Sequence, residues 1–195
     1  DFVSATPTRE RDLRLFARAD HRFAGGARLQ ANVSTYRHRF DFAQPVSGVS
    51  LYDSGRGDYV RQPNERTDLD VSLHTPMSAD WMLVAGVAAG RSSMDRGTVS
   101  LANWRDASSV STQINAGKGS ANNQAVFVQS EHLLSDTLTA YVGGRYDRYE
   151  TQGEVSQDTA PAFLQSFSKR DFSRFSPKIA MVWKASPALS LRASF

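Results

Sequence analysis

Three polar stretches of this 195-residue sequence carry aromatic side chains interleaved with arginine and lysine, over positions 40–64, 95–123 and 151–174. Aromatic rings stack on flat ligands and guanidinium groups pair with anions. The mixture therefore suits an anionic, ring-bearing ligand such as a catecholate ferric chelate. Packing between loops, or contact with lipopolysaccharide, is the simpler interpretation of the same residues. The candidate ligand contacts are Phe42, Tyr52, Arg56, Tyr59, Arg61, Trp104, Arg105, Phe167, Lys169 and Arg170.

Residues that could carry catalysis or hold a cofactor do not form a recognisable constellation. Asp68 and Asp70 would lie about 6–7 Å apart on one strand face, but nothing closes a site around them, so no catalytic residue and no enzymatic activity are expected. The four histidines are dispersed over positions 21, 38, 74 and 132, and no pair has metal-ligand spacing on one element. This predicts no metal site. With neither a glycine-rich phosphate loop nor a nucleophile elbow, no cofactor is expected.

Composition excludes several classes of protein. The net charge of +3 comes without a clustered Lys/Arg stripe, so nucleic acid is not an expected partner. Cysteine is absent, which rules out a disulfide scaffold and a thiolate metal site. No apolar run approaches 18 residues, and the most apolar stretch is 81–89. This excludes a transmembrane helix but leaves a transmembrane β-barrel open, because barrel strands hide their hydrophobicity in alternation.

Alternation of apolar and polar residues predicts the elements that position these side chains, and it is clearest in a hairpin over 125–150. Two long arms flank the polar break Ser135-Asp136, and in the second arm Arg145 and Asp147 point to one side while Tyr146 points to the other. Eight strands are expected, over 12–23, 28–39, 65–75, 81–94, the two arms of 125–150, 175–184 and 189–195.

The predicted connections alternate strictly between short turns and loops of roughly twenty residues or more. The strands are about ten residues or longer, beyond the usual five or six. Long strands, alternating polarity and alternating loop length are together typical of an outer-membrane β-barrel, with short turns in the periplasm. The first connection is short, so the eighth strand runs outward. An eight-stranded barrel would keep both termini in the periplasm, and we therefore expect a segment of a larger barrel.

The strand faces of such a barrel can be assigned from charge. The lumen-facing candidates are Arg14, Arg18, Arg66, Asp68, Asp70, Arg145 and Asp147, where interior ion pairing is the simpler role and ligand passage the alternative. Trp81 and Trp183 each flank a short turn. They are expected to form part of an aromatic girdle at the membrane interface; a core position in a β-sandwich is the alternative.

Three stretches near the end of the sequence resemble TonB-dependent outer-membrane receptors. They are 125–139 (AVFVQSEHLLSDTLT), 143–150 (GGRYDRYE) and 175–195 (FSPKIAMVWKASPALSLRASF). The resemblance covers about the last third of the chain, and the first 120 residues match only in pattern. It implies a barrel of about 22 strands, a plug domain, and TonB-energised import of ferric siderophores, cobalamin or haem. Residues 1–195 would then be a partial barrel domain, with the plug and the C-terminal strands absent.

The function expected from these features is that of a barrel wall in an outer-membrane importer of a scarce metal chelate, with a ferric siderophore foremost. The expected partners are outer-membrane lipid, the chelate, and the TonB energising complex acting through the plug. Two alternatives stay open. One is a passive or structural outer-membrane barrel such as a porin or adhesin, and the other is a soluble β-sandwich binding module.

Overall fold

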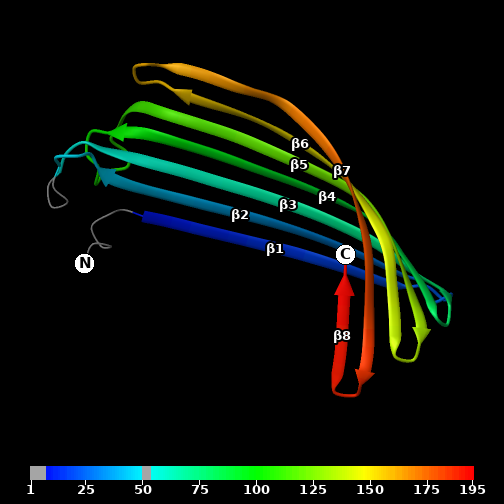
Figure 1. Cartoon of the computed structure of the whole chain (residues 1–195). Helices are drawn as coiled ribbons and strands as arrows, with labels where there is room; N and C mark the ends of the chain where they lie inside the picture. The colour runs from blue at the N-terminus through cyan, green and yellow to red at the C-terminus, as the bar shows by residue number, and fades with distance from the viewer. Residues whose placement is uncertain (1–7, 50–53) are drawn as a thin grey trace.

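Eight β-strands form the chain in this computed structural model, which describes residues 8–49 and 54–195. They are β1 (Thr8–Arg22), β2 (Arg28–Pro45), β3 (Gly57–Ser78), β4 (Trp81–Leu101), β5 (Val110–Ser135), β6 (Leu138–Gln157), β7 (Phe163–Ser186) and β8 (Leu189–Ser194). Each strand pairs antiparallel with its sequence neighbours in one sheet ordered β1 to β8 (Figure 1). The predicted number of strands is confirmed. Within the described residues, no helix is long and apolar enough to cross a membrane.

The strands extend well beyond the ranges that the sequence pattern predicts. β5 has 26 residues and β7 has 24. The expected loops over 40–64, 95–123 and 151–174 are therefore wrong, because most of these residues pair as strand. The connecting segments are only 46–56, 102–109 and 158–162. Ladder hydrogen bonds are made by the backbone, so a polar sequence continues a strand without leaving an apolar alternation to detect.

The opposite ends of the strands are joined by the segments 23–27, 79–80, 136–137 and 187–188. We call this side the turn end and the side of 46–56, 102–109 and 158–162 the loop end. Each connection at the loop end is longer than the turns that flank it, so the predicted alternation holds along the whole chain. The third predicted long loop is wrong in length, because 158–162 is no longer than 23–27. Gly26, with φ of 83°, makes the first turn possible, and its amide donates to the Phe23 carbonyl over 2.9 Å.

The register divides the side chains into two faces. The apolar face carries large exposed side chains such as Leu13, Leu69, Val87, Val126 and Ile179. Most of the buried small and polar residues lie on the polar face, and the exceptions are Asp41 and Ala43 near the loop end. Those on the polar face are Ser72, Thr98, Ser100, Ala125, Asp147 and Ala180. Because side chains crowd together on a concave surface, this burial identifies the polar face as the inside of the curve.

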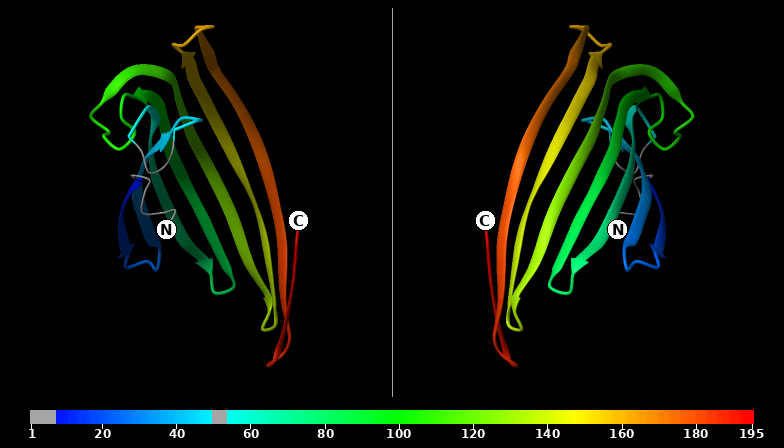
Figure 2. Two further views of the ribbon diagram at one scale, coloured as in Figure 1. Left: turned by 90° about the vertical axis from the view of Figure 1, so that its left-hand side faces the viewer. Right: turned by 90° about the vertical axis from the view of Figure 1, so that its right-hand side faces the viewer.

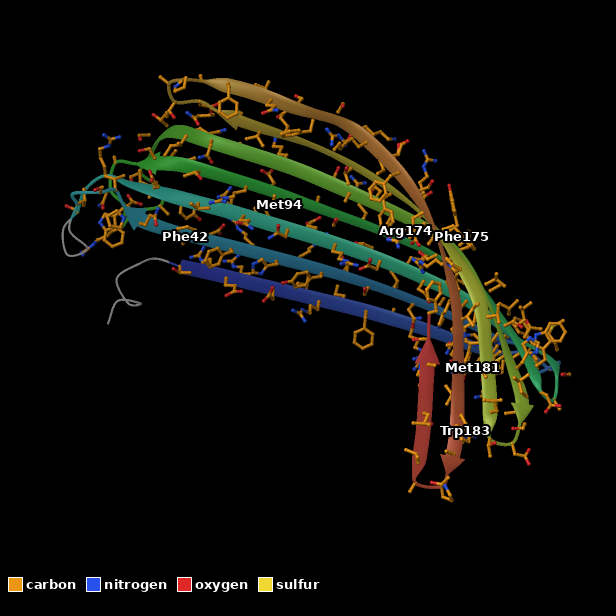
Figure 3. The ribbon with its side chains drawn as sticks, in the orientation of Figure 1. Phe42, Met94, Arg174, Phe175, Met181 and Trp183 are labelled. Carbon is orange, nitrogen blue, oxygen red and sulfur yellow. The ribbon has the colours of Figure 1, made fainter. Side chains whose placement is uncertain are left out.

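Over residues 8–49 and 54–195 the sheet is a single curved and twisted layer with no second layer against it (Figures 1 and 2). Register shifts interrupt five of the seven strand pairs, beginning with the Pro76/Ser78 step between β3 and β4. Such bulges bend a strand and increase its twist. Met181 and Trp183 lie toward the turn that joins β7 and β8 (Figure 3). A single layer with exposed Leu, Val and Ile is not a soluble β-sandwich, which needs two packed sheets.

Candidate ligand-binding wall

The structure separates the ten candidate ligand contacts. Only Arg56, Trp104 and Arg105 lie in connecting segments. Tyr52 lies outside the described residues. The loop assignment is wrong for the others, which are strand residues: Phe42 in β2, Tyr59 and Arg61 in β3, and Phe167, Lys169 and Arg170 in β7. These stretches are polar in sequence, but the backbone hydrogen bonds between the strands continue through them.

The strand candidates are also divided between the faces. The register puts Phe42 and Arg170 on the polar face, whereas Tyr59, Arg61 and Lys169 point to the opposite side. Residues on opposite faces of one sheet cannot contact the same ligand. The candidates therefore do not form one site.

Trp104 is a buried anchor rather than an exposed contact. It has no exposed surface, and neither do Ala43 and Leu101, two other apolar residues near the loop end. Its amide donates to the Gly55 carbonyl over 2.8 Å, which ties segment 102–109 to segment 46–56. Within the same segment, hydrogen bonds from the side chain and backbone amide of Ser108 hold the pKa of Asp106 below its usual value.

All seven lumen-facing candidates share the polar face by register. Arg66 Nε donates to Asp68 over 2.7 Å, and Arg145 Nε lies 2.9 and 3.1 Å from the two oxygens of Asp147. These pairs are formed by residues two apart on one strand, which point the same way. Arg18 lies 3.6 Å from Asp20, and Arg14 lies over the Tyr36 ring. Five of the seven thus take part in ion pairs with side chains on the same strand, and their role in the complete barrel stays a prediction.

The polar face has a further aromatic and cationic group over β6 and β7, about midway along β7 (Figure 3). Tyr149 and Phe172 stack with ring centroids 4.9 Å apart and planes 15° from parallel. Arg170 and Arg174 occupy the same face of β7, and within the described chain neither makes an ion pair. We call these four residues the Tyr149 patch. Tyr149 and Arg174 are not among the ligand contacts predicted from the sequence, although extending the register of the 125–150 hairpin by one strand pairs Tyr149 with Phe172.

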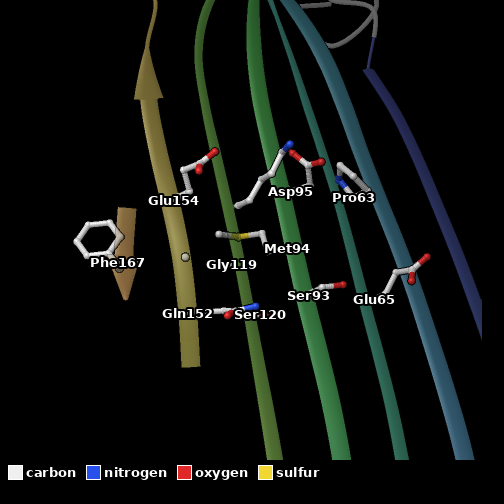
Figure 4. Close-up of a pocket in the computed structure, with 12 residues that line it drawn as sticks. Pro63, Glu65, Ser93, Met94, Asp95, Gly119, Ser120, Gln152, Glu154 and Phe167 are labelled. Carbon is white, nitrogen blue, oxygen red and sulfur yellow. The ribbon is translucent and has the colours of Figure 1, made fainter. Parts of the chain in front are cut away.

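Two shallow hollows lie outside this patch. One of about 580 Å³ crosses β3 to β7 and is lined by Glu65, Asp95, Lys118, Glu154 and Phe167, among others (Figure 4). An adjacent hollow of about 560 Å³ is lined by Arg39, Tyr59 and Arg61, among others. Most of the charged side chains that line these hollows point to the same side of the sheet as the apolar face. They lie closer to the loop end than most of its exposed Leu, Val and Ile residues. They therefore do not belong to the concave wall.

The two tryptophans expected at the membrane interface lie near the turn end on the apolar face. Trp81 Nε1 donates to Ser130 Oγ over 2.7 Å, and its ring stacks on His132 with centroids 5.5 Å apart. Trp183 is half exposed and pairs with Leu138 and Leu191. An indole with an apolar body and one hydrogen-bonded polar edge suits a boundary between apolar and wet surroundings.

Comparison with known proteins agrees with this geometry. The family model for the β-barrel of TonB dependent receptor-like proteins matches residues 2–195. No curated protein sequence matches the chain. Among solved structures, the ferric yersiniabactin uptake receptor FyuA from Yersinia pestis has a TM-score of 0.70 at 11% identity, over 97% of this chain and 28% of its own.

Two other structures share the fold. The ferripyoverdine receptor of Pseudomonas aeruginosa has a TM-score of 0.63 at 18% identity, over 93% of this chain and 26% of its own. The copper transporter OprC has a TM-score of 0.68 at 12% identity, over 94% and 30%. The chain thus spans under a third of these proteins. Because the family model covers nearly the whole sequence, the chain belongs to the β-barrel family of TonB-dependent receptors.

Proposed function

We propose that this chain is part of the barrel wall of an outer-membrane receptor that imports a scarce metal chelate, with a ferric siderophore as the foremost class. The observation that carries the proposal is the family match along residues 2–195. The related structures support the class of ligand, because those proteins are receptors or transporters for ferric yersiniabactin, ferripyoverdine and copper.

The same proposal includes the parts of the protein that surround this chain. In the described sheet, β1 and β8 are each paired along one side only. Open edges are not tolerated in lipid, where every backbone group needs a partner. Further strands would close the barrel, a plug domain would fill it, and the TonB complex would act through the plug. Outer-membrane lipid would cover the apolar face.

The Tyr149 patch gives the wall its proposed chemistry. The stacked rings of Tyr149 and Phe172 offer a flat apolar surface beside the two guanidinium groups of Arg170 and Arg174. An aryl chelate carrying negative charge would stack on the rings and accept hydrogen bonds from the cations. The patch lies about midway along β7 on the concave face, where a ligand passing through the barrel would meet it.

The test is uptake of radiolabelled iron by cells that produce the complete receptor, with a panel of ferric chelates as ligands. Deleting the gene should abolish uptake of at least one chelate. Replacing Arg170 and Arg174 with glutamine should raise the half-saturating concentration at least about tenfold, because charge-assisted hydrogen bonds contribute about 1.5–3 kcal/mol each. Lys169→Gln is the matched control, since Lys169 faces away and pairs with Glu150. Unchanged uptake of every metal chelate after deletion would refute the proposal.

A further inference from the structure

Three metal-ligating side chains meet where β1 pairs with β2, away from the Tyr149 patch. Asp12 lies directly opposite His38 in the register, and Glu10 is two residues from Asp12 on β1. All three therefore point to the polar face. The spacing of histidines within single elements predicts no metal site, but this cluster joins two strands. Counting outward from the Gly25-Gly26 turn would have paired Asp12 with His38.

The donor atoms are already close to the spacing that one metal ion requires. His38 Nδ1 lies 2.8 Å from Asp12 Oδ1 and 3.8 Å from Glu10 Oε1. All three donor atoms lie within 4.8 Å of one another. Ligands about 2.0–2.2 Å from a tetrahedral ion are roughly 3.4 Å apart. Rotamer adjustments of the two carboxylates, which are 59% and 46% exposed, would be enough to close the cluster around an ion.

A neighbouring residue outside the cluster holds one of these ligands in place. The Tyr36 hydroxyl donates to Asp12 Oδ1 over 2.9 Å, and the Tyr36 ring is itself covered by the Arg14 guanidinium at 4.8 Å. The Tyr36 and His38 rings also stack, with centroids 6.1 Å apart. His38 is the most enclosed of the three ligands, at 21% exposed. Hydrogen bonds of this kind orient metal-binding carboxylates and imidazoles in known sites.

We propose that Glu10, Asp12 and His38 bind a divalent first-row transition metal ion, such as Zn²⁺, on the inner wall of the barrel. One imidazole nitrogen with two carboxylate oxygens is a donor set for zinc, nickel or copper, whereas calcium and magnesium prefer oxygen ligands alone. Three protein ligands leave a position of the tetrahedron open toward the barrel interior. The site is independent of the Tyr149 patch and of the identity of the chelate.

The experiment is a calorimetric titration of the purified complete receptor with ZnCl₂ at neutral pH, alongside electron paramagnetic resonance with Cu²⁺. His38→Ala and Asp12→Asn should each weaken Zn²⁺ binding at this site at least tenfold, and His38→Ala should remove one nitrogen coupling from the Cu²⁺ spectrum. Tyr36→Phe should weaken binding by about tenfold through loss of its hydrogen bond to Asp12. His74→Ala is the matched control, because His74 shares the polar face and contacts Ser72 rather than a carboxylate.

The outcomes separate a metal site from a simple Asp–His hydrogen bond. Binding that is lost in His38→Ala and Asp12→Asn but kept in His74→Ala supports the site. Binding should also weaken as the pH falls, since a ligating imidazole must be unprotonated. If the receptor binds no Zn²⁺, or if His38→Ala, Asp12→Asn and His74→Ala all bind as the natural protein does, the proposal is overturned. Chelate uptake does not decide this proposal, because the titration measures Zn²⁺ binding directly.

Discussion

Asp147 shows how one residue depends on its neighbour within this wall. It is only 6% exposed, and both of its carboxylate oxygens lie within 3.1 Å of Arg145 Nε. The Arg145 guanidinium also lies over the ring of Phe127, the residue opposite Arg145 on β5. The charged carboxylate of Asp147 can be buried because Arg145 lies two residues away on the same strand. Side chains two apart point to the same face, so the two groups can pair.

Removing that partner should therefore destabilise the wall. Arg145→Ala leaves the buried Asp147 carboxylate unpaired, and we expect a loss of about 3 kcal/mol of unfolding free energy. Urea unfolding of the complete protein in lipid bilayers would measure it. The double variant Arg145→Ala/Asp147→Ala should recover part of the loss. Arg66→Ala is the matched control, because its partner Asp68 is 37% exposed and surface pairs contribute little. Equal losses in Arg66→Ala and Arg145→Ala would contradict this account.

Gly57 has a role that only the packing of Trp104 reveals. A Cβ added at Gly57 would lie 2.2 Å from the Trp104 Cβ and 2.4 Å from the Gln44 carbonyl oxygen. Gly57→Ala should therefore displace the Trp104 anchor and cost about 1–3 kcal/mol. Faster protease cleavage within 102–109 on intact cells would report it. Gly97→Ala is the control, since a Cβ there meets nothing within 4 Å; equal cleavage of the two variants would argue against a buried anchor.

At the residue scale, the sequence predicts which face of a strand a side chain occupies, but it does not predict which side chains from other strands it contacts. Arg145 and Asp147 are placed on one face by period alone, and the structure has them there. Trp104 looks like an exposed ligand contact in the sequence because its neighbours are polar, but it is buried against Gly57 of β3. The pairing of Asp12 with His38 also depends on a register that alternation by itself does not fix.

The strands are the elements whose length the sequence underestimates. The apolar alternation ends where β2, β4 and β6 leave the apolar band, yet the backbone ladder continues to Pro45, Leu101 and Gln157. Turn positions are easier to predict, because Gly25-Gly26, Ser135-Asp136 and Pro187 are local signals. The sequence therefore locates the turn end well and the loop end poorly.

Hydrogen exchange tests this strand extension directly. In the complete protein, backbone amides over 110–123, 151–157 and 163–174 should exchange slowly, because they lie within paired strands. Amides over 102–109 should exchange faster, as a connecting segment does. Mass spectrometry of peptic peptides would resolve the two groups. Exchange over 151–174 that is as fast as over 102–109 would mean that this stretch is the loop that the polarity pattern suggests.

At the scale of the whole molecule, the two faces of the sheet require different environments, one apolar and one polar. A water-soluble protein would have to cover Leu69, Val87, Val126 and Ile179, which are 43–55% exposed, with a second layer. Membership in the barrel family resolves this, because the chain is an outer-membrane segment. In the proposed complete barrel, the apolar face would meet lipid and the polar face would line the interior.

Cysteine labelling on intact cells tests this placement most directly. The chain contains no cysteine, so a single substitution reports its own position within it. With a maleimide that cannot cross membranes, Ala107→Cys at the loop end should react. Asp136→Cys at the turn end should react only after the outer membrane is opened, and Val126→Cys on the apolar face should stay unreactive in both states. Reaction of all three positions on intact cells, at similar rates, would contradict the account of this chain as a membrane-spanning barrel wall.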